Sequence, residues 1–570
     1  MIITIVILSG CSSEESSNKP RLFNNQGTQG DHVLCIIDIG PINDAIFNNL
    51  ISEERLPNIQ KFISRGQKYK LSDSTRYFDN AVIYSEFLTG INSEDNGIAT
   101  SWWGTDNVTR YASSGSGDLS TTPLWEKFSQ NRINSLFINI PLTYPAPQTD
   151  AVVISENFLI CANDGINPPE LRDYLRINGV VPDIEGLDFQ IKDLLSPKTV
   201  IAKADIEALN RFINFPLSER NFDDLLKDNI DPGSEYLEYC LRLLAWELRK
   251  DRTMLEMLTL LDESYPPPDF IAIRSGVLEI ALKCFIRFHY AQGFNIRPFE
   301  MEVFGDVVER CFEYEDDLIG RVGEILSGNR DIILFAGYQI EPSSLWWDSL
   351  KDGSMNSAIL YRGHPVGIRL NPSDLANELN SALRSKHDVI LKPPQSWPLY
   401  SLHQSNLSFE YQLLPESSGY RKINKISELL SNCSDEFGNK LFSEVKLLHG
   451  KEKKILLTPR NGIKPSDLFD ADGFIIDAKD FITAVPQISG FSKPGGMAII
   501  SPKNGKTPER IEIKSTSDLH YLVLSLLEIQ SDPHIFYNTV IDSTGNILNI
   551  PEEKPCDSEL EYCLKALGYL

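Results

Sequence analysis

The feature that most constrains the fold is a series of short runs made up almost entirely of apolar residues. Residues 33–37 (VLCII) form the first of them. A strand with apolar side chains on both faces is typical of a parallel sheet that is covered on both sides. We expect further strands at the other runs of this kind, which are residues 136–140, 152–154, 270–273, 332–335, 474–476 and 497–500.

Segments with helical spacing separate several of these runs. The longest covers residues 235–262, where leucines recur every three or four positions. Strands that alternate with helices predict an α/β fold with a mostly parallel, doubly wound sheet and helices on both faces. At 570 residues the chain is too long for one minimal core. We therefore expect an inserted cap besides the core.

Composition suggests where the cap lies. Residues 336–485 are more irregular and contain many Pro, Ser and Asn residues. We expect a core from 31 to 335, a cap at 336–485 and a return to the core at 486–570. Residues 1–30 would be a signal and a polar tether.

The N-terminus resembles a bacterial lipoprotein signal. A short apolar run leads into Leu-Ser-Gly-Cys at residues 8–11, followed by a Ser- and Glu-rich tract. The run is too short to span a bilayer. No Lys or Arg precedes it, which departs from the pattern, and a chance match is the alternative. The resemblance implies a lipid on Cys11 and an extracytoplasmic position, anchored to the membrane of the bacterial envelope.

Charge and cysteine spacing argue against several classes of function. The formal net charge of −25 disfavours nucleic-acid partners, because phosphates would be repelled. The nine cysteines include no CxxC pair, so neither a zinc ribbon nor a thioredoxin-type site is expected.

Several motifs follow one another in an order that has a known counterpart. They are Asp38 after the first strand, then RLPN (55–58), FLTG (87–90), NGI (96–98), PLW (123–125), NIPLTYP (139–145), and late segments at 496–502, 518–527 and 564–570. Together they resemble the alkaline-phosphatase-like superfamily, in its type I phosphodiesterase/nucleotide pyrophosphatase branch. The resemblance covers most of residues 31–570 and implies that superfamily's α/β fold.

Members of this branch use two divalent metals, Zn or Mn, and a Thr or Ser nucleophile. The resemblance places Asp38 at a metal-ligand position and Asn80 at the nucleophile position. The other ligand positions fall on Leu278, Leu282, Ala336, Gly337 and Ser492. A carboxamide cannot form a covalent phospho-intermediate, and one carboxylate cannot hold two metals. The hydrolytic site is therefore expected to be lost, with no cofactor bound.

Three hypotheses remain open. The first is a catalytically inactive protein that binds a ligand or a protein partner, with Asn80, Ser85, Ser354 and Ser492 offering neutral hydrogen bonds. The second is an active metal-dependent phosphoester hydrolase with relocated ligands, drawn from Asp38, Glu279, His32, His289 and His364. The third is a purely structural lipoprotein, which a crevice filled by Leu278 and Leu282 would favour. Asp38 has a structural alternative too, as a cap of the following helix.

Overall fold

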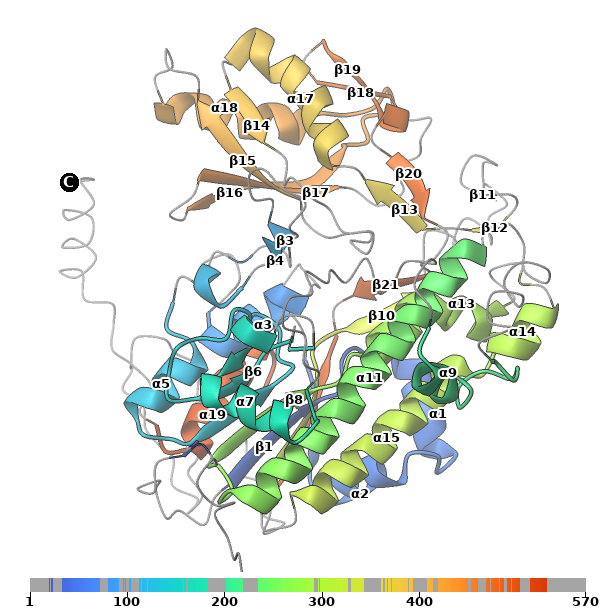
Figure 1. Cartoon of the computed structure of the whole chain (residues 1–570). Coiled ribbons are helices and arrows are strands. Elements are labelled where there is room, and N and C mark those ends of the chain that lie inside the picture. Colours follow the sequence, from blue (N-terminus) through green and yellow to red (C-terminus); the bar gives the residue numbers. More distant parts are fainter. Residues whose placement is uncertain are drawn as a thin grey trace, which may run out of the picture.

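The structure is a computed structural model of the whole chain (Figure 1). It describes residues 20, 22–23, 33–71, 80–91, 96, 98, 102–103, 112–113, 115–119, 121–156, 158–159, 162–181, 201–218, 234–291, 296, 298–326, 330–342, 360–361, 364–365, 367–370, 372–387, 389–392, 407–413, 419–449, 453–459, 468–471, 473–480, 482–485, 489–493, 495–502 and 513–529. Cys11, His32, Ser354 and the motif at 564–570 lie outside these residues.

An eight-stranded sheet forms the core, with strand order β2-β22-β9-β1-β8-β5-β6-β7. The five central strands are parallel. The outer strands β2 and β22 at one side and β7 at the other run antiparallel to their neighbours. The strands are β1 (Val33–Asp38), β2 (Gln67–Lys70), β5 (Ser135–Ile138), β6 (Val152–Ile154), β7 (Ile166–Asn167), β8 (Phe270–Arg274), β9 (Arg330–Ala336) and β22 (Met497–Ser501). The predicted α/β fold with a mostly parallel sheet is confirmed.

Helices cover both faces of this sheet (Figure 1). On one face, α5 (Leu124–Gln130) places Phe128 against Phe137 of β5 and Phe270 of β8. On the same face, Phe87 of α3 (Asn80–Thr89) stacks on Phe335 of β9. The other face is covered by α2 (Pro57–Arg65), α11 (Ser234–Ser264) and α15 (Val307–Ile325).

The remaining helices of the core are α1 (Asp44–Ser52), α6 (Ala162–Gly165), α7 (Pro169–Ile177), α9 (Lys203–Leu209), α12 (Val277–Ile280), η2 (Ala281–Phe285), α13 (Ile286–His289), α14 (Pro298–Phe304) and α19 (Thr516–Leu526), with a 3₁₀ turn η1 (Ser116–Asp118). The segment η2 is a π-helical turn. Within the described part of the chain, no helix is both long and apolar enough to cross a membrane.

Several helix starts have a recognisable cap. Asn43 accepts a hydrogen bond from the Ile46 N–H and so caps α1. Ser515 and Asp518 form a capping box at α19. Helix α2 starts with Pro57 and has no side-chain cap of its own, but Asp316 of α15 accepts hydrogen bonds from the backbone N–H groups at its first turn. This contact fixes α2 to α15.

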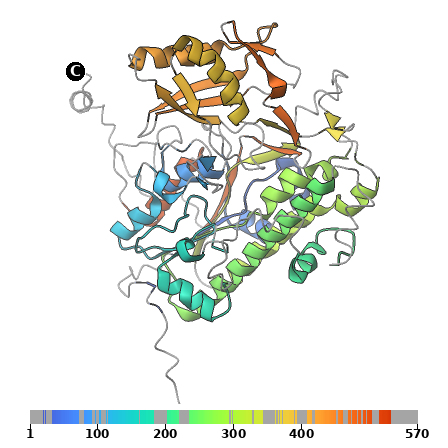
Figure 2. The same cartoon turned by 45° about the horizontal axis from the view of Figure 1, so that its top comes forward.

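A second, smaller apolar core lies within residues 375–478. It belongs to the cap, which sits above the carboxyl ends of the parallel strands (Figures 1 and 2). The cap contains a four-stranded antiparallel sheet in the order β14-β15-β17-β16. Its elements are β13 (Gly367–Leu370), α17 (Pro372–His387), β14 (Val389–Lys392), β15 (Leu407–Leu413), α18 (Gly419–Asn432), β16 (Phe442–His449), β17 (Lys453–Pro459), β18 (Leu468–Asp470), β19 (Ile475–Asp477), η5 (Ala478–Asp480) and β20 (Ile482–Val485).

Two strands connect the cap to the core. Strand β10 (Gln339–Pro342) leaves the core and pairs antiparallel with β21 (Gly490–Lys493), which returns to it. Two short pairs complete the described strands, namely β3 (Trp102–Trp103) with β4 (Ala112–Ser113) and β11 (Leu360–Tyr361) with β12 (His364–Pro365).

Two of the expected strands are not parallel strands of the main sheet. The run at 474–476 lies within the expected cap, where Ile475–Asp477 (β19) pairs with β18 in a hairpin. The run at 497–500 joins the main sheet antiparallel to β9. The long helix expected at 235–262 is present as α11. Short apolar runs therefore identified strands, but not which sheet they join or their direction.

Candidate functional site

The candidate site lies at the carboxyl ends of β1 and β8, where two charged residues end neighbouring strands. Asp38 is the last residue of β1 and Arg274 the last of β8, and the two are direct partners in the parallel register. Arg274 Nε lies 3.4 Å from Asp38 Oδ2, and both side chains are about 95% buried or more. Partners in register point to the same face of a sheet, so strand pairing itself brings the two charges together.

Asp38 has two further contacts that hold its carboxylate in place. Oδ1 accepts a hydrogen bond of 2.9 Å from the backbone N–H of Gly40, and Oδ2 accepts one from the Tyr84 hydroxyl on α3. Gly40 has a φ of +77°, a conformation that favours glycine and turns the chain back toward the carboxylate. Burial raises the pKa of Asp38 to about 7, although Arg274 and the Gly40 N–H act in the opposite direction.

Glu279, on α12 directly after β8, is the second carboxylate of the site. Its Oε2 accepts hydrogen bonds from Arg274 Nη2 at 2.6 Å and from Asn80 Nδ2 at 2.7 Å, and its Oε1 is bound by Lys283. Burial alone would raise the pKa of Glu279, but Lys283 and Arg274 hold it well below its usual range. Glu279 is therefore ionised and both of its oxygens are bonded.

Arg274 thus lies between two carboxylates. Burial alone would lower the pKa of its guanidinium, but Glu279 and Asp38 raise it, so the cation stays charged. We call Asp38, Arg274 and Glu279 the charge triad. The triad links the ends of β1 and β8 to the first turn of α12.

Asn80, at the predicted nucleophile position, does face this site. It begins α3 one helical turn before Tyr84, so both side chains point toward the strand ends. Besides donating to Glu279, its amide oxygen accepts a hydrogen bond of 3.2 Å from the Tyr338 hydroxyl. Both ends of the Asn80 carboxamide are bound to protein side chains.

The other predicted positions contribute no charged group. Leu278 and Leu282 are fully buried in the apolar core, and Glu279 is the residue of α12 that faces Asn80. Ala336 is also fully buried, and a Cβ added to Gly337 would lie 2.6 Å from Ile83 of α3. Ser492 lies in β21 opposite Ile340. Ser85 faces elsewhere, since it donates to the Val82 carbonyl and accepts from Asn96.

The relocated ligands of the alternative hypothesis come together only in part. Asp38 and Glu279 converge, but on Arg274. His289 lies on α13 and its Nδ1 is 3.5 Å from Glu309 of α15. His364 lies in β12, and His32 is outside the described residues. Within the described ranges, no three His, Cys, Asp or Glu side chains are grouped so that they could hold a metal ion.

These contacts do not fit a divalent metal at the charge triad. A two-metal site needs several anionic or imidazole ligands with free lone pairs. Here one carboxylate faces a guanidinium and the other is bound by Arg274, Lys283 and Asn80. The positive charge that such carboxylates would take from a metal is supplied by side chains of the same chain.

The sequence pointed to Asp38 and Asn80 but missed Arg274, Tyr84 and Tyr338. The signal for Arg274 was present, because a charged residue directly ends the apolar run at 270–273. An arginine there pairs with the residue that ends the neighbouring strand. The two tyrosines carry no comparable signal, since each lies within an apolar segment.

Comparison with known proteins finds similarity only among solved structures. No protein-family model matches the sequence, and no curated protein is significantly similar to it. Phosphonoacetate hydrolase from Sinorhizobium meliloti has a TM-score of 0.43 at 10% identity, over 87% of this chain and 96% of that one. Human ectonucleotide pyrophosphatase/phosphodiesterase 5 has a TM-score of 0.39 at 10% identity, over 88% and 97%. The murine protein of that name has a TM-score of 0.40, with the same identity and coverage.

Replacing Arg274 should destabilise the core strongly. In Arg274→Met, two buried carboxylates lose their shared cation, so we expect the free energy of unfolding at pH 8 to fall by about 3–5 kcal/mol. Urea denaturation followed by circular dichroism measures it. Adding Glu279→Gln should restore part of the loss.

The matched control is Arg310→Met. Arg310 of α15 pairs with Asp306, which directly precedes this helix, and the Arg310 side chain is 30% exposed. Loss of this ion pair should change the free energy of unfolding by less than about 1 kcal/mol. If the two single variants lower the free energy of unfolding equally, the charge triad contributes no more to stability than a surface ion pair does.

Proposed function

We propose that this chain is a catalytically inactive protein with a phosphodiesterase-like fold. It would be held at the bacterial envelope by a lipid on Cys11 and would act by binding a ligand or a protein partner. The observation that carries the proposal of inactivity is the position of Arg274 between Asp38 and Glu279.

A guanidinium cannot replace a catalytic metal in its chemistry. A metal has open coordination positions at which it polarises a phosphoryl oxygen or generates a bound hydroxide. Arg274 has no such position, is buried, and has two carboxylates as its neighbours. Asn80 in turn has no ionisable proton and cannot act as a nucleophile in the way a hydroxyl does. Arg274 thus neutralises the two carboxylates, but the triad and Asn80 provide no group that polarises a phosphoryl oxygen or attacks phosphorus.

The closed triad favours binding at the surface over binding at the strand ends. Both oxygens of Glu279 and both ends of Asn80 are occupied by protein groups. In the cap, Leu468 and Ile475 are 52% and 62% exposed and lie on the outer face of the β18–β19 hairpin. Exposed apolar side chains in one place support partner binding.

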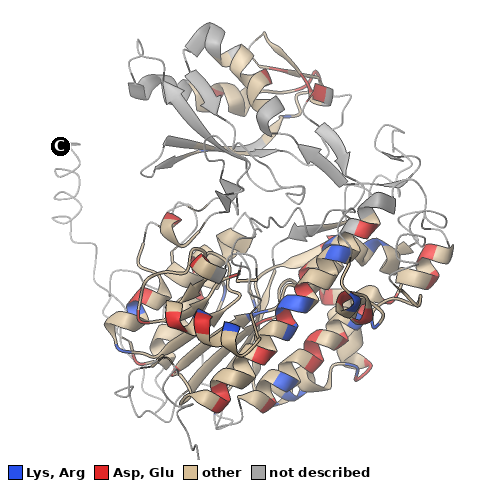
Figure 3. Cartoon of the chain, viewed as in Figure 1, with Lys and Arg blue, Asp and Glu red and all other residues tan. Residues whose placement is uncertain are grey.

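The charge distribution supports the exclusion of nucleic acid from the proposed partners. Lys and Arg alternate with Asp and Glu along α11 and α15 (Figure 3). The formal net charge of the chain is −25. A protein that binds the phosphate backbone generally concentrates basic residues on one face.

A hydrolysis assay tests inactivity. We expect no turnover of bis(4-nitrophenyl) phosphate or 4-nitrophenyl phosphate by the purified chain with excess Zn²⁺ or Mn²⁺. Glu279→Gln and Asn80→Ala are the matched controls, because each removes a group of the site. Metal-dependent turnover that either change abolishes would contradict the proposal and support an active phosphoester hydrolase with relocated ligands.

Cell fractionation tests the lipid anchor separately. In a bacterial host, the unaltered chain should sediment with membranes and incorporate labelled palmitate, because the lipid is attached at Cys11. Cys11→Ser should abolish the label and leave the protein in the soluble fraction. Equal membrane association without label in both forms would mean that the Leu-Ser-Gly-Cys match is due to chance.

A further inference from the structure

Two more carboxyl groups meet behind the charge triad, on the opposite side of the strand end. Asp251 of α11 and Glu315 of α15 are both fully buried. The hydroxyl of Ser275, the residue after Arg274, lies 2.7 Å from Asp251 Oδ2 and 2.5 Å from Glu315 Oε1. No charged group of the triad takes part in these two contacts.

The number of protons in this arrangement can be counted. A serine hydroxyl has one proton to donate and two lone pairs that accept. One lone pair of Ser275 Oγ accepts from the Val277 N–H at 3.3 Å. The hydroxyl can donate to one carboxylate only, so the second short contact needs a proton on the other carboxyl. Two ionised carboxylates would leave two acceptor oxygens facing each other at hydrogen-bond distance.

We infer that Asp251 and Glu315 share one proton across the Ser275 hydroxyl, and that this carboxyl pair is a proton-binding site which makes the stability of the core depend on pH. The inference does not depend on whether the chain is catalytic. It assigns one proton to the pair and leaves open which carboxyl carries it.

The cations near the pair form ion pairs with other carboxylates, although Lys250 and Arg274 act to lower the pKa of Asp251. On α11, Glu247 and Lys250 form an ion pair of 2.8 Å with each other. Arg274 of β8 faces Asp38 of β1 and Glu279 of α12. Among the described residues no cation makes an ion pair with Asp251 or Glu315, and Asp251 Oδ1 and Glu315 Oε2 have no hydrogen-bond partner.

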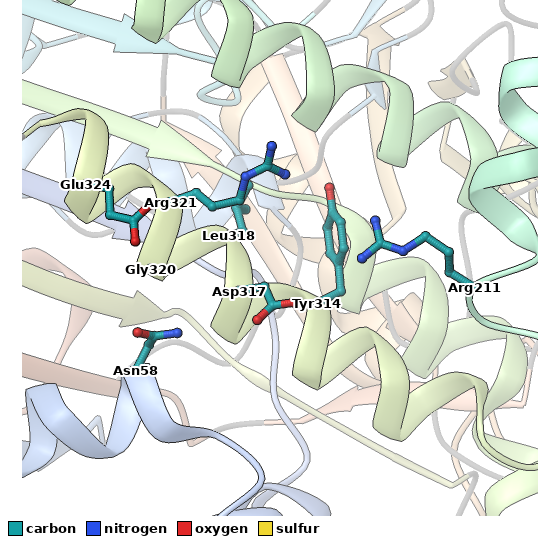
Figure 4. A pocket seen from close by; sticks show the side chains of 8 residues that line it. All are labelled: Asn58, Arg211, Tyr314, Asp317, Leu318, Gly320, Arg321 and Glu324. Atoms are coloured by element: carbon teal, nitrogen blue, oxygen red, sulfur yellow. The ribbon is translucent and has the colours of Figure 1, made fainter.

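On α15, Tyr314 interacts electrostatically with the carboxyl pair and with two exposed arginines, Arg211 and Arg321. It borders a pocket of about 290 Å³ in which Arg211 and Arg321 point toward its ring from opposite sides (Figure 4). Burial raises the pKa of Tyr314, Asp251 and Glu315 raise it further, and Arg211 and Arg321 lower it. The tyrosine is therefore neutral.

The pKa shifts agree with a retained proton. Burial raises the pKa of Asp251 to about 7, although the bond from Ser275 acts against it. Burial and the neighbouring Asp251 raise the pKa of Glu315 well above its usual range. Both shifts favour a proton held within the pair.

The sign of the pH dependence follows from proton counting. Unfolded carboxyls lose their protons near pH 4, whereas the native pair retains at least one. The native state then binds more protons, so each retained proton makes the unfolding equilibrium constant rise about tenfold per pH unit. For Asp251 this loss runs from about pH 4 to its folded pKa of about 7. The raised pKa of Glu315 contributes a loss of the same sign.

Urea unfolding of the full chain between pH 5 and 8.5 tests the inference. Glu315→Gln imitates the protonated acid, since its amide can donate to Ser275 while Asp251 still accepts. We expect this variant to lose the equivalent of one proton, about tenfold per pH unit, from the pH dependence of unfolding. Asp317→Asn, an exposed carboxylate on the same helix, should follow the unaltered chain. An unchanged slope in Glu315→Gln would overturn the inference.

Infrared spectroscopy provides a readout that needs no variant. At pH 8 the native protein should show the carbonyl stretch of one protonated carboxyl, shielded from solvent. Absence of that band would overturn the inference even if the variants fail to fold. If Glu315→Gln folds, it should lack the band. A full band in this variant would assign the proton to another group and would also contradict the inference.

Discussion

The ion pairs of Arg274 with Asp38 and Glu279 join three separate parts of the core. Asp38 ends β1, Arg274 ends β8, and Glu279 lies in the first turn of the following helix. Each charge is buried and would be costly without the others. Lys283, Asn80 and Tyr84 donate further hydrogen bonds to the two carboxylates. Parallel pairing of β1 with β8 and the placement of α3 above their ends therefore satisfy these buried charges together.

Two consecutive residues at the end of β8 belong to separate polar networks. Arg274 points to one face of the sheet and meets carboxylates that are paired with cations. Ser275, one position later, points to the other face and meets two carboxyls that are not. Alternation along a strand explains why consecutive residues serve different networks. The first network depends on a fixed positive charge and the second on a proton. Because burial raises the pKa of both Asp38 and Asp251 to about 7, each network contains a carboxyl that titrates near neutral pH.

Sequence predicted the fold better than the site, for a physical reason. A parallel strand covered on both faces must be apolar throughout, so runs such as 33–37 and 270–273 are visible in the sequence. The run at 474–476 looks the same, yet it belongs to the cap, because apolarity does not specify a partner strand. Helix α11 was visible through its periodic leucines. The direction of β22 was not, since nothing in one strand encodes its orientation.

For the site, the sequence did not show how far beyond the end of β8 each functional residue lies. The family resemblance pointed to Leu278 and Leu282 after this strand, but β8 ends at Arg274, and Glu279 is the residue that faces Asn80. The contacts of Ser275 with Asp251 and Glu315 span 24 and 40 residues, and no local pattern predicts them. These contacts form only when α11 and α15 pack against the sheet.

The central claim is that the guanidinium of Arg274, and not a bound metal, balances the charge of Asp38 and Glu279. Metal content by plasma mass spectrometry, after incubation of the full chain with excess Zn²⁺ and Mn²⁺ and dialysis, tests it most directly. The account predicts a well-folded protein with no stoichiometric metal. About two ions per chain, lost in Asp38→Asn or Glu279→Gln, would contradict it and would show that a two-metal site forms despite Arg274.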